Sequence, residues 1–464
     1  MEEIILDGII NLLCNTYFHL LFYRLIKLTD MLKPMFLFAY ALLSFSVLKS
    51  QTKIKKLDSL INELSVRKDF NGSVLIANEK GMFYKKNIGF QFKGNRENIR
   101  AMCIGSITKT FTAAAIAKLW EQDILKLDDP VTKYIPSFKN GDSITLRMLL
   151  NHTSGVKREI FDDLDERKKD HSSTELTDSI IKYQLDSKPG KNYSYSNAGY
   201  ALLARIIEII TKKSYAQYLS ENIFKPLQMN DTKVLMIASK KDKGFDPSGY
   251  PKGVEEAFPE SGSSNFGAGN IYSTIDDLYK WNLAFTKKNR VLRSNTWDTI
   301  LRKAYGFGRY KRLDKIAIGH DGIVNGFIAN LDYFENEKTT ITFLSSVRSG
   351  ALGYLQDGLA QIYFYDKSPV VLPEFSKQLD KSALKIFVGS YELFPGFNLD
   401  IMLKNGQLYL RGKGGYFTYL DNVQSNTFFY RALYAFIEFK KEGDKYTLYW
   451  KDLSGSVYPG KKVL

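Results

Sequence analysis

Apolar and polar residues alternate in some parts of the chain and recur at helical spacing in others. Two strand-like runs, 72–78 and 82–88, flank Glu79-Lys80-Gly81, so we predict a hairpin there. Residues 108–119 (TKTFTAAAIAKL) indicate an apolar, alanine-rich helix, and the charged stretch 158–173 indicates a surface excursion. Further helices are predicted at residues 145–151, 175–185 and 199–211, and further strands at residues 317–318, 327–333 and 339–346. Strands at both ends with helices between them predict an α+β domain with a helical insertion.

The end of the chain follows an all-β pattern. Alternating apolar residues on both sides of Asn405-Gly406 predict a hairpin with a two-residue turn, and a second hairpin is expected around Glu442-Gly443-Asp444. Short antiparallel strands of this kind indicate a small barrel or sandwich. We therefore predict a main domain at residues 51–366, a linker at 367–380 and a C-terminal β domain at 381–464.

The first 50 residues have the pattern of a targeting segment. Residues 35–48 (MFLFAYALLSFSVL) are an apolar run that is short for a membrane span and suits a signal peptide, with Lys33 before it. Met31 is an alternative start, and Ser46–Ser50 offers cleavage sites. We expect residues 1–50 to direct export, either as a cleaved signal or as an N-terminal anchor, with a buried core helix as the alternative.

Composition narrows the classes of partner and cofactor. The chain has 65 Lys and Arg against 50 Asp and Glu, which gives a net charge of +15. The basic residues are scattered and form no nucleic-acid motif, so we expect no nucleic-acid partner; a basic surface also suits contact with an anionic cell envelope. Two cysteines and four histidines provide neither a disulfide framework nor a multi-histidine metal site, and we expect no cofactor.

Ser106 and Lys109 stand three residues apart at the predicted helix, so their side chains point the same way. A lysine of lowered pKa can take the proton of a serine hydroxyl and make it a nucleophile. The same spacing follows Ser65, Ser154, Ser179 and Ser382, where a helix cap beside a solvated lysine explains it. Ser106 differs because it follows Gly105 at the start of a buried helix, where free N–H groups can stabilise an oxyanion.

Two further motifs carry chemistry. Tyr195-Ser196-Asn197 precedes the helix predicted at 199–211. A phenol relays protons if neighbouring cations lower its pKa, and an amide can hold a lysine and a substrate carbonyl, although a turn with a packed tyrosine has the same pattern. His320-Asp321-Gly322 lies before the loop 323–326, where a histidine can meet a substrate, although single histidines are more often structural.

In this order, the three motifs resemble the serine β-lactamase and penicillin-binding-protein superfamily, most closely its class C β-lactamase-like branch, which also holds esterases and D-amino-acid peptidases. The resemblance covers roughly residues 70 to 350. It includes Leu127–Val131, Thr145–Gly155, Ser273–Leu278 and Gly306–Gly308. The tail looks like the small β-barrel domain that often follows these catalytic domains. The resemblance implies an antiparallel sheet flanked by helices plus an all-α subdomain, the β-lactamase/transpeptidase-like fold.

The resemblance also implies roles for individual residues. Ser106 would be the acylated nucleophile and Lys109 its proton acceptor or activator. Tyr195 would be general base and acid, and Asn197 would bond Lys109 and the substrate. The backbone N–H groups of Ser106 and Ile323 would form the oxyanion hole.

The third motif departs from the family pattern. β-Lactamases of this class usually carry Lys-Thr-Gly, where this chain has His320-Asp321-Gly322. The resemblance places His320 among the catalytic residues and Asp321 and Gly322 in substrate binding. A largely neutral histidine supplies little charge for a substrate carboxylate near pH 7, so we expect poor β-lactam hydrolysis.

These observations predict an exported serine hydrolase that forms an acyl-enzyme on Ser106 and acts on a small molecule or short peptide. Esters, amides and short D-amino-acid peptides are the expected substrates. A class C-type β-lactamase or a penicillin-binding D,D-peptidase is the alternative. A non-catalytic envelope protein that uses the same fold for binding ranks below both.

Overall fold

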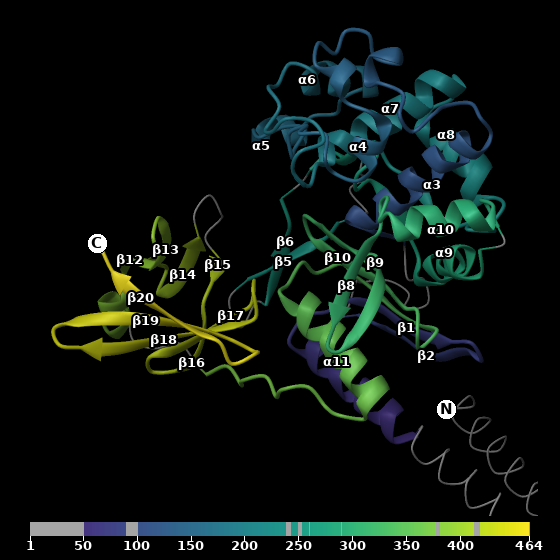
Figure 1. Cartoon of the computed structure of the whole chain (residues 1–464). Coiled ribbons are helices and arrows are strands. Elements are labelled where there is room, and N and C mark those ends of the chain that lie inside the picture. Colours follow the sequence, from purple (N-terminus) through teal and green to yellow (C-terminus); the bar gives the residue numbers. More distant parts are fainter. Residues whose placement is uncertain are drawn as a thin grey trace, which may run out of the picture. The chain divides into compact units, whose positions relative to one another are not determined.

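The computed structural model describes residues 51–89, 101–237, 243–248, 253–258, 260–288, 290–376, 381–412 and 418–463. The predicted targeting segment at residues 1–50 lies outside them. Residues Asp58–Leu464 pack as one compact unit (Figure 1). No helix of the described residues combines the length and the apolar composition that crossing a membrane requires.

A six-stranded antiparallel sheet forms the centre of the main domain, with strand order β2-β1-β11-β10-β9-β8. Its strands are β1 (Gly72–Asn78), β2 (Gly81–Ile88), β8 (Gly308–Arg312), β9 (Lys315–Val324), β10 (Phe327–Phe334) and β11 (Thr339–Ser345). Inner strands β10 and β11 are buried along almost their whole length, whereas edge strand β2 is mostly exposed or half-buried. The hairpin predicted around Glu79-Lys80-Gly81 is confirmed.

Helix α3 (Thr108–Glu121) is the central helix of the fold. Its alanine-rich sequence leaves room for close neighbours, and Phe111 stacks on Trp281 with ring centroids 4.1 Å apart. Residues 51–66 are also helical. The other helices are α4 (Leu146–Leu150), α5 (Leu164–Lys168), α6 (Ser173–Ile180), α7 (Asn197–Thr211), α8 (Tyr215–Leu219), α9 (Ile275–Lys287), α10 (Ser294–Arg302), α11 (Ala351–Tyr365) and α12 (Lys381–Leu384). Figure 1 shows α4 to α8 gathered above the sheet as a helical subdomain.

One predicted helix ends early. The apolar pattern predicts a helix to residue 185, but α6 ends at Ile180, and Asp186 N–H instead donates to Gly155 O at 2.8 Å. The predicted charged excursion at 158–173 also contains the short helix α5, which the Asp163 side chain caps.

Two small sheets lie beside the main one. The first has the order β3-β7-β4, and the second is the hairpin β5–β6. Their strands are β3 (Met102–Cys103), β4 (Lys233–Val234), β5 (Phe245–Pro247), β6 (Val254–Glu256) and β7 (Ile271–Ser273).

The C-terminal region forms a nine-stranded antiparallel, barrel-like sheet of order β15-β14-β13-β12-β20-β19-β18-β17-β16. Its strands are β12 (Gly389–Phe394), β13 (Phe397–Lys404), β14 (Gln407–Gly412), β15 (Thr418–Tyr419), β16 (Asp421–Gln424), β17 (Thr427–Tyr430), β18 (Ala435–Glu442), β19 (Lys445–Asp452) and β20 (Val457–Lys462). Asn405 and Gly406 have φ of 52° and 78°, as the predicted two-residue turn requires. The predicted fold class is confirmed, whereas the exact domain limits stay a prediction.

Candidate active site

Ser106 lies in a single 3-10 turn, η1 (Gly105–Ile107), directly before α3. Gly105 has a φ of +50°, and a Cβ atom there would lie 2.8 Å from the backbone nitrogen of Ile323 in β9. A Cβ atom on Gly322 would lie 2.0 Å from Ile104 O. Glycine at both positions therefore allows β9 to lie against η1, which brings the Ile323 N–H group beside the turn that carries Ser106.

Lys109 is fully buried one turn after Ser106. Its Nζ lies 3.1 Å from Ser106 Oγ, 2.7 Å from Asn197 Oδ1 and 2.9 Å from Ala268 O. Burial without a carboxylate in direct contact lowers the pKa of Lys109 well below its ordinary value.

The partners of Lys109 fit an uncharged amine. A neutral amine has two N–H groups and one lone pair, and the Asn197 and Ala268 oxygens can only accept hydrogen bonds. When both N–H groups serve these two oxygens, the lone pair is left for the hydroxyl proton of Ser106. The arrangement is therefore able to remove that proton.

Asn197 is held in a fixed orientation from both ends of its amide. Its Nδ2 donates to Glu159 Oε2 at 2.8 Å, which turns Oδ1 toward Lys109. Glu159 also brings a negative charge near the amine and moderates the lowering of the Lys109 pKa. Arg158, whose side chain is 63% exposed, acts on that pKa in the opposite direction.

Tyr195 Oη donates to Ser106 Oγ at 2.9 Å. Burial raises the pKa of Tyr195 above its ordinary value, although the Ser106 hydroxyl and Arg158 act to lower it. The lowered pKa that a tyrosinate base requires is therefore absent, since burial outweighs the nearby cation. Tyr195 is a phenol at neutral pH and can donate a proton.

His152 supports Tyr195 from behind. The two rings stack with centroids 4.5 Å apart, and His152 Nδ1 accepts the Ser196 N–H at 3.0 Å. Burial, with nearby Lys109, lowers the pKa of His152 to about 3, so it is neutral and its Nδ1 can accept.

His320 is half-buried in β9, with its ring centroid 6.2 Å from that of Tyr195. Burial and the nearby Lys109 lower the pKa of His320 to about 4. Its Nδ1 lies 2.6 Å from Asp321 O, which can only accept a hydrogen bond. Nδ1 therefore carries the proton, and Nε2 is unprotonated and can accept a hydrogen bond.

Asp321 lies on the other face of the sheet. Neighbouring residues of a strand point to opposite sides, and the Asp321 carboxylate accepts hydrogen bonds from Asn330 and from Gln356 of α11. Ser106, Lys109, Tyr195, Asn197 and His320 are thus brought together, with the backbone of Gly322 and Ile323. The carboxylate of Asp321 is not brought to them.

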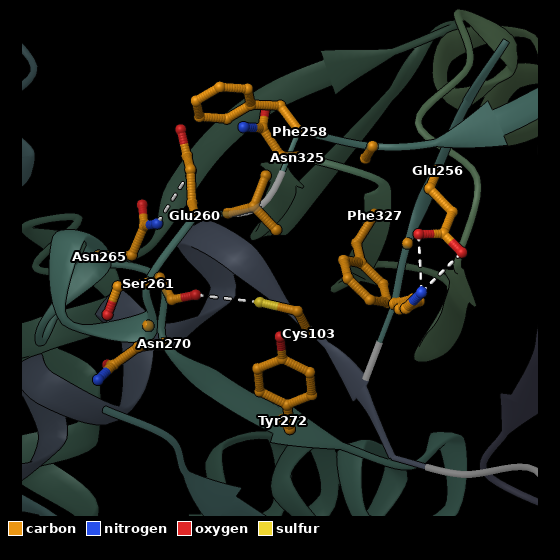
Figure 2. A pocket seen from close by; sticks show the side chains of 16 residues that line it. Cys103, Glu256, Phe258, Glu260, Ser261, Asn265, Asn270, Tyr272, Asn325 and Phe327 are labelled. Carbon is orange, nitrogen blue, oxygen red and sulfur yellow. Dashed lines mark hydrogen bonds and ion pairs between the residues drawn. The ribbon is translucent and has the colours of Figure 1, made fainter. Parts of the chain in front are cut away.

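A cavity of about 260 Å³ lies in the main domain. It is lined by residues close in sequence to some of the site residues, and not by Ser106, Lys109, Tyr195, Asn197 or His320 themselves. Its wall includes Cys103, three residues before Ser106, Gly269, which follows the Ala268 acceptor of Lys109, and Val324, which follows Ile323. Figure 2 shows other lining side chains, among them Phe258, Tyr272, Phe327, Glu260 and Asn325. The cavity wall therefore combines aromatic and apolar side chains with charged and polar ones, a mixture that can hold a ligand and fix its orientation.

Three contributors to the site, Ala268, Glu159 and His152, are not among the residues that the sequence predicts there. His152 lies inside the family-like stretch Thr145–Gly155, which was a usable signal. Ala268 acts only through its backbone oxygen, and Glu159 is one acid in a charged stretch, so neither carries a local signal. In the described part of the chain, no three His, Cys, Asp or Glu side chains gather as a metal site requires.

Comparisons with known proteins agree with this geometry. Residues 58–360 match the family model Beta-lactamase. Penicillin-binding protein 4* of Bacillus subtilis (strain 168) is 28% identical over 431 residues, which cover 84% of this chain and 94% of that protein. Protein flp of Staphylococcus aureus (strain MW2) is 30% identical over 298 residues, 60% of this chain and 59% of that protein.

A solved structure has the same fold. The D-amino acid amidase from Ochrobactrum anthropi SV3, complexed with D-phenylalanine, aligns with a TM-score of 0.59 and 21% identity, covering 69% of this chain and 99% of that chain. The match of the family model to well over half of the chain identifies the family. The chain belongs to the Beta-lactamase family and is a serine hydrolase of the β-lactamase and penicillin-binding-protein superfamily.

Proposed function

We propose that this chain hydrolyses amide or ester bonds of short substrates with a D-amino-acid-like acyl group, through an acyl-enzyme on Ser106. One observation carries the proposal: Ser106 Oγ lies 3.1 Å from the buried amine of Lys109 and 2.9 Å from the phenol of Tyr195. The hydroxyl thus has a proton acceptor and a proton donor within hydrogen-bond reach.

Acylation follows from these contacts. Neutral Lys109 takes the hydroxyl proton while Ser106 Oγ attacks the substrate carbonyl carbon, and the carbonyl oxygen becomes an oxyanion at the N–H groups of Ser106 and Ile323. Tyr195 gives its proton to the leaving amine or alkoxide as the carbon–heteroatom bond breaks. Lys109 then returns the proton it took to Tyr195, which restores both groups.

Deacylation uses the same groups with water in place of the leaving group. Tyr195 takes one proton from the attacking water and passes its own to neutral Lys109. As the Ser106 oxygen leaves the acyl carbon, Lys109 gives that proton to it. No group outside the site is required for the proton balance. The reaction consumes one water and releases one acid.

The cavity supports an amino-acid-like acyl group. Phe258, Tyr272 and Phe327 offer apolar surface for a side chain of about the size of phenylalanine. The Glu260 carboxylate lies 3.6 Å from Arg167 and 3.4 Å from Asn265, both long contacts, and can bind the ammonium group of a substrate.

β-Lactam hydrolysis is the second candidate, because penicillin-binding protein 4* of Bacillus subtilis (strain 168) is a relative over 84% of the chain. Against it stands neutral His320 where the superfamily pattern has a lysine, since no fixed positive charge is then supplied to the carboxylate of a β-lactam. We therefore rank β-lactams below amino-acid-like amides and esters.

The test is intact-mass measurement after treatment with a fluorophosphonate and, separately, with a penicillin. We expect one fluorophosphonate adduct on the wild type and none on Ser106→Ala. Ser179→Ala is the matched control, because Ser179 in α6 and Lys182 just beyond its end have the same spacing in the sequence. A stoichiometric adduct on Ser106→Ala contradicts the proposed nucleophile, and a long-lived penicillin adduct indicates binding without efficient hydrolysis.

We also propose that the protein is exported and acts in the cell envelope, on the strength of the sequence pattern of residues 1–50. N-terminal sequencing of the protein recovered from the secreted and membrane fractions tests this. A new terminus at about Ser46–Ser50 supports a cleaved signal, and an intact terminus in the membrane fraction supports an anchor. An intact terminus in the cytoplasmic fraction contradicts export.

A further inference from the structure

Arg431 of the C-terminal β domain is buried, and its side chain contacts residues that are far from it in sequence. It lies in the turn between β17 and β18 and is 2% exposed. Its Nε donates to Asp69 Oδ1 at 2.7 Å, and one terminal nitrogen donates to Ser248 O at 3.1 Å and to Gly253 O at 2.8 Å. Its other terminal nitrogen donates to two carbonyl oxygens of the segment before Asp69.

The carbonyl oxygens of Ser248 and Gly253 belong to the hairpin β5–β6. Ser248 directly follows β5, and Gly253 directly precedes β6, so one guanidinium group holds both strands at the same end. In Figure 1 this hairpin lies beside the end of β17, in agreement with these contacts. Because a guanidinium has a planar, fixed set of donors, it fixes the position of both carbonyl groups at once.

The opposite end of the hairpin forms part of the cavity wall. Gly244, Glu256 and Ala257 all line the cavity, and Ala257 N–H donates to Gly244 O at 3.0 Å. Phe258, whose ring is seen in Figure 2, continues the same strand into the cavity. A shift of the hairpin would therefore move an aromatic wall of the cavity.

The hairpin is held to the main domain by backbone hydrogen bonds of Phe245 to Gly326, Ser346 and Arg348, and by the Arg348 side chain. Arg348 pairs with Asp246 at 2.8 Å and donates to Asn325 Oδ1 at 2.8 Å, and Asn325 also lines the cavity. This contact fixes the cavity end, whereas Arg431 fixes the far end. Arg431 thus ties the hairpin, and with it part of the cavity wall, to the C-terminal domain.

We infer that Arg431 is a positioning residue for the acyl-group pocket, so that the C-terminal β domain helps to set substrate specificity. The inference rests on the proposed function, which makes the cavity the acyl-group pocket. Arg431 does not touch the reacting atoms. Its effect is expected on substrates that fill the cavity and not on substrates too small to reach its wall.

The experiment compares kcat/KM for p-nitrophenyl acetate and for the p-nitrophenyl ester of D-phenylalanine in the wild type and in Arg431→Lys. Lysine keeps the charge near Asp69 but cannot bond both carbonyl groups and the carboxylate together. We expect kcat/KM for the D-phenylalanine ester to fall about tenfold, mainly through KM, and that for the acetate to stay within about twofold. Arg411→Lys is the control, because Arg411 pairs with Asp400 within the same β domain.

Hydrogen exchange followed by mass spectrometry provides a second readout that needs no turnover. In Arg431→Lys we expect faster exchange in the peptides that contain β5 and β6, with α3 and the central sheet unchanged. An unchanged ratio of the two esters, or unchanged exchange in β5 and β6, overturns the inference.

Poor folding of Arg431→Lys and failure of the proposed function lead to different outcomes. If Arg431→Lys does not fold, Asp421→Asn takes its place, because the Asp421 carboxylate lies 3.9 Å from Arg431 Nε. If the wild type hydrolyses neither ester, the proposed function has failed, and the positioning of the hairpin by Arg431 is decided by exchange alone.

Discussion

Two neighbouring residues of opposite charge provide a test of which group takes the Ser106 proton. Glu159 raises the pKa of Lys109 and Arg158 lowers it. Glu159→Gln keeps an acceptor for Asn197 Nδ2 but removes the negative charge. The variant is therefore expected to lower the pKa of Lys109 further, so that the reactive neutral amine persists to lower pH. Arg158→Gln is expected to act in the opposite direction.

The size of the effect follows from the geometry. The hydrogen bonds of 2.8 Å and 2.7 Å on either side of the Asn197 amide place the Glu159 carboxylate about 7 Å from Lys109 Nζ. At an effective dielectric constant of about 20, two charges at that distance interact by about 2.4 kcal/mol, or about 1.7 pKa units. Glu159 is 31% exposed, so screening reduces the expected shift to about one unit. Arg158 is 63% exposed, and its expected shift is smaller.

The assay is the pre-steady-state burst of p-nitrophenol from p-nitrophenyl acetate between pH 5 and pH 10. The acylation rate should fall at low pH, where Lys109 is protonated; we call this fall the acidic limb. We expect the midpoint of the acidic limb to move to lower pH by about one pH unit in Glu159→Gln and to higher pH in Arg158→Gln. Tyr195→Phe separates the two candidate bases, because the limb persists at a lower rate if Lys109 is the base. Shifts of equal sign, or loss of the limb in Tyr195→Phe, would refute the assignment to Lys109.

Three further outcomes are expected. Tyr195→Phe should lower steady-state turnover by about 10² or more while the protein stays folded, which circular dichroism and kcat together check. His320→Lys should strengthen binding of carboxylate-bearing substrates by about 1–2 kcal/mol; unchanged KM for a chromogenic cephalosporin contradicts this. The pKa of His152 is about 3 in the fold and about 6.5 when unfolded, so the free energy of unfolding should fall by up to about 1.4 kcal/mol per unit as pH drops between them. Urea unfolding of His152→Asn should show a shallower dependence, and an equal slope contradicts the argument.

The sequence predicts features that are encoded within one turn or one hairpin. The three-residue spacing of Ser106 and Lys109 brings their side chains to 3.1 Å, and Asn405-Gly406 forms the expected turn. Strand alternation also contains the information that Asp321 and His320 face opposite ways, although the motif alone groups them together.

Other features depend on contacts that no local pattern encodes. Ala268 lies 159 residues from Lys109 and contributes a backbone oxygen, which any residue supplies. Arg431 lies 362 residues from Asp69, and in the sequence it is one of many scattered basic residues. Such partners become visible only when the fold brings distant segments together.

Burial explains how an amine and a phenol on the same serine take opposite roles. Removal from water disfavours a charge of either sign, so it lowers the pKa of Lys109 and raises the pKa of Tyr195. The amine thereby becomes a base and the phenol stays a proton donor, and burial alone accounts for both protonation states. The same burial keeps His320 neutral, so the three groups nearest the substrate carry no fixed positive charge. We therefore expect the site to favour a neutral amide or ester, because neutral His320 adds no attraction for the carboxylate of a β-lactam.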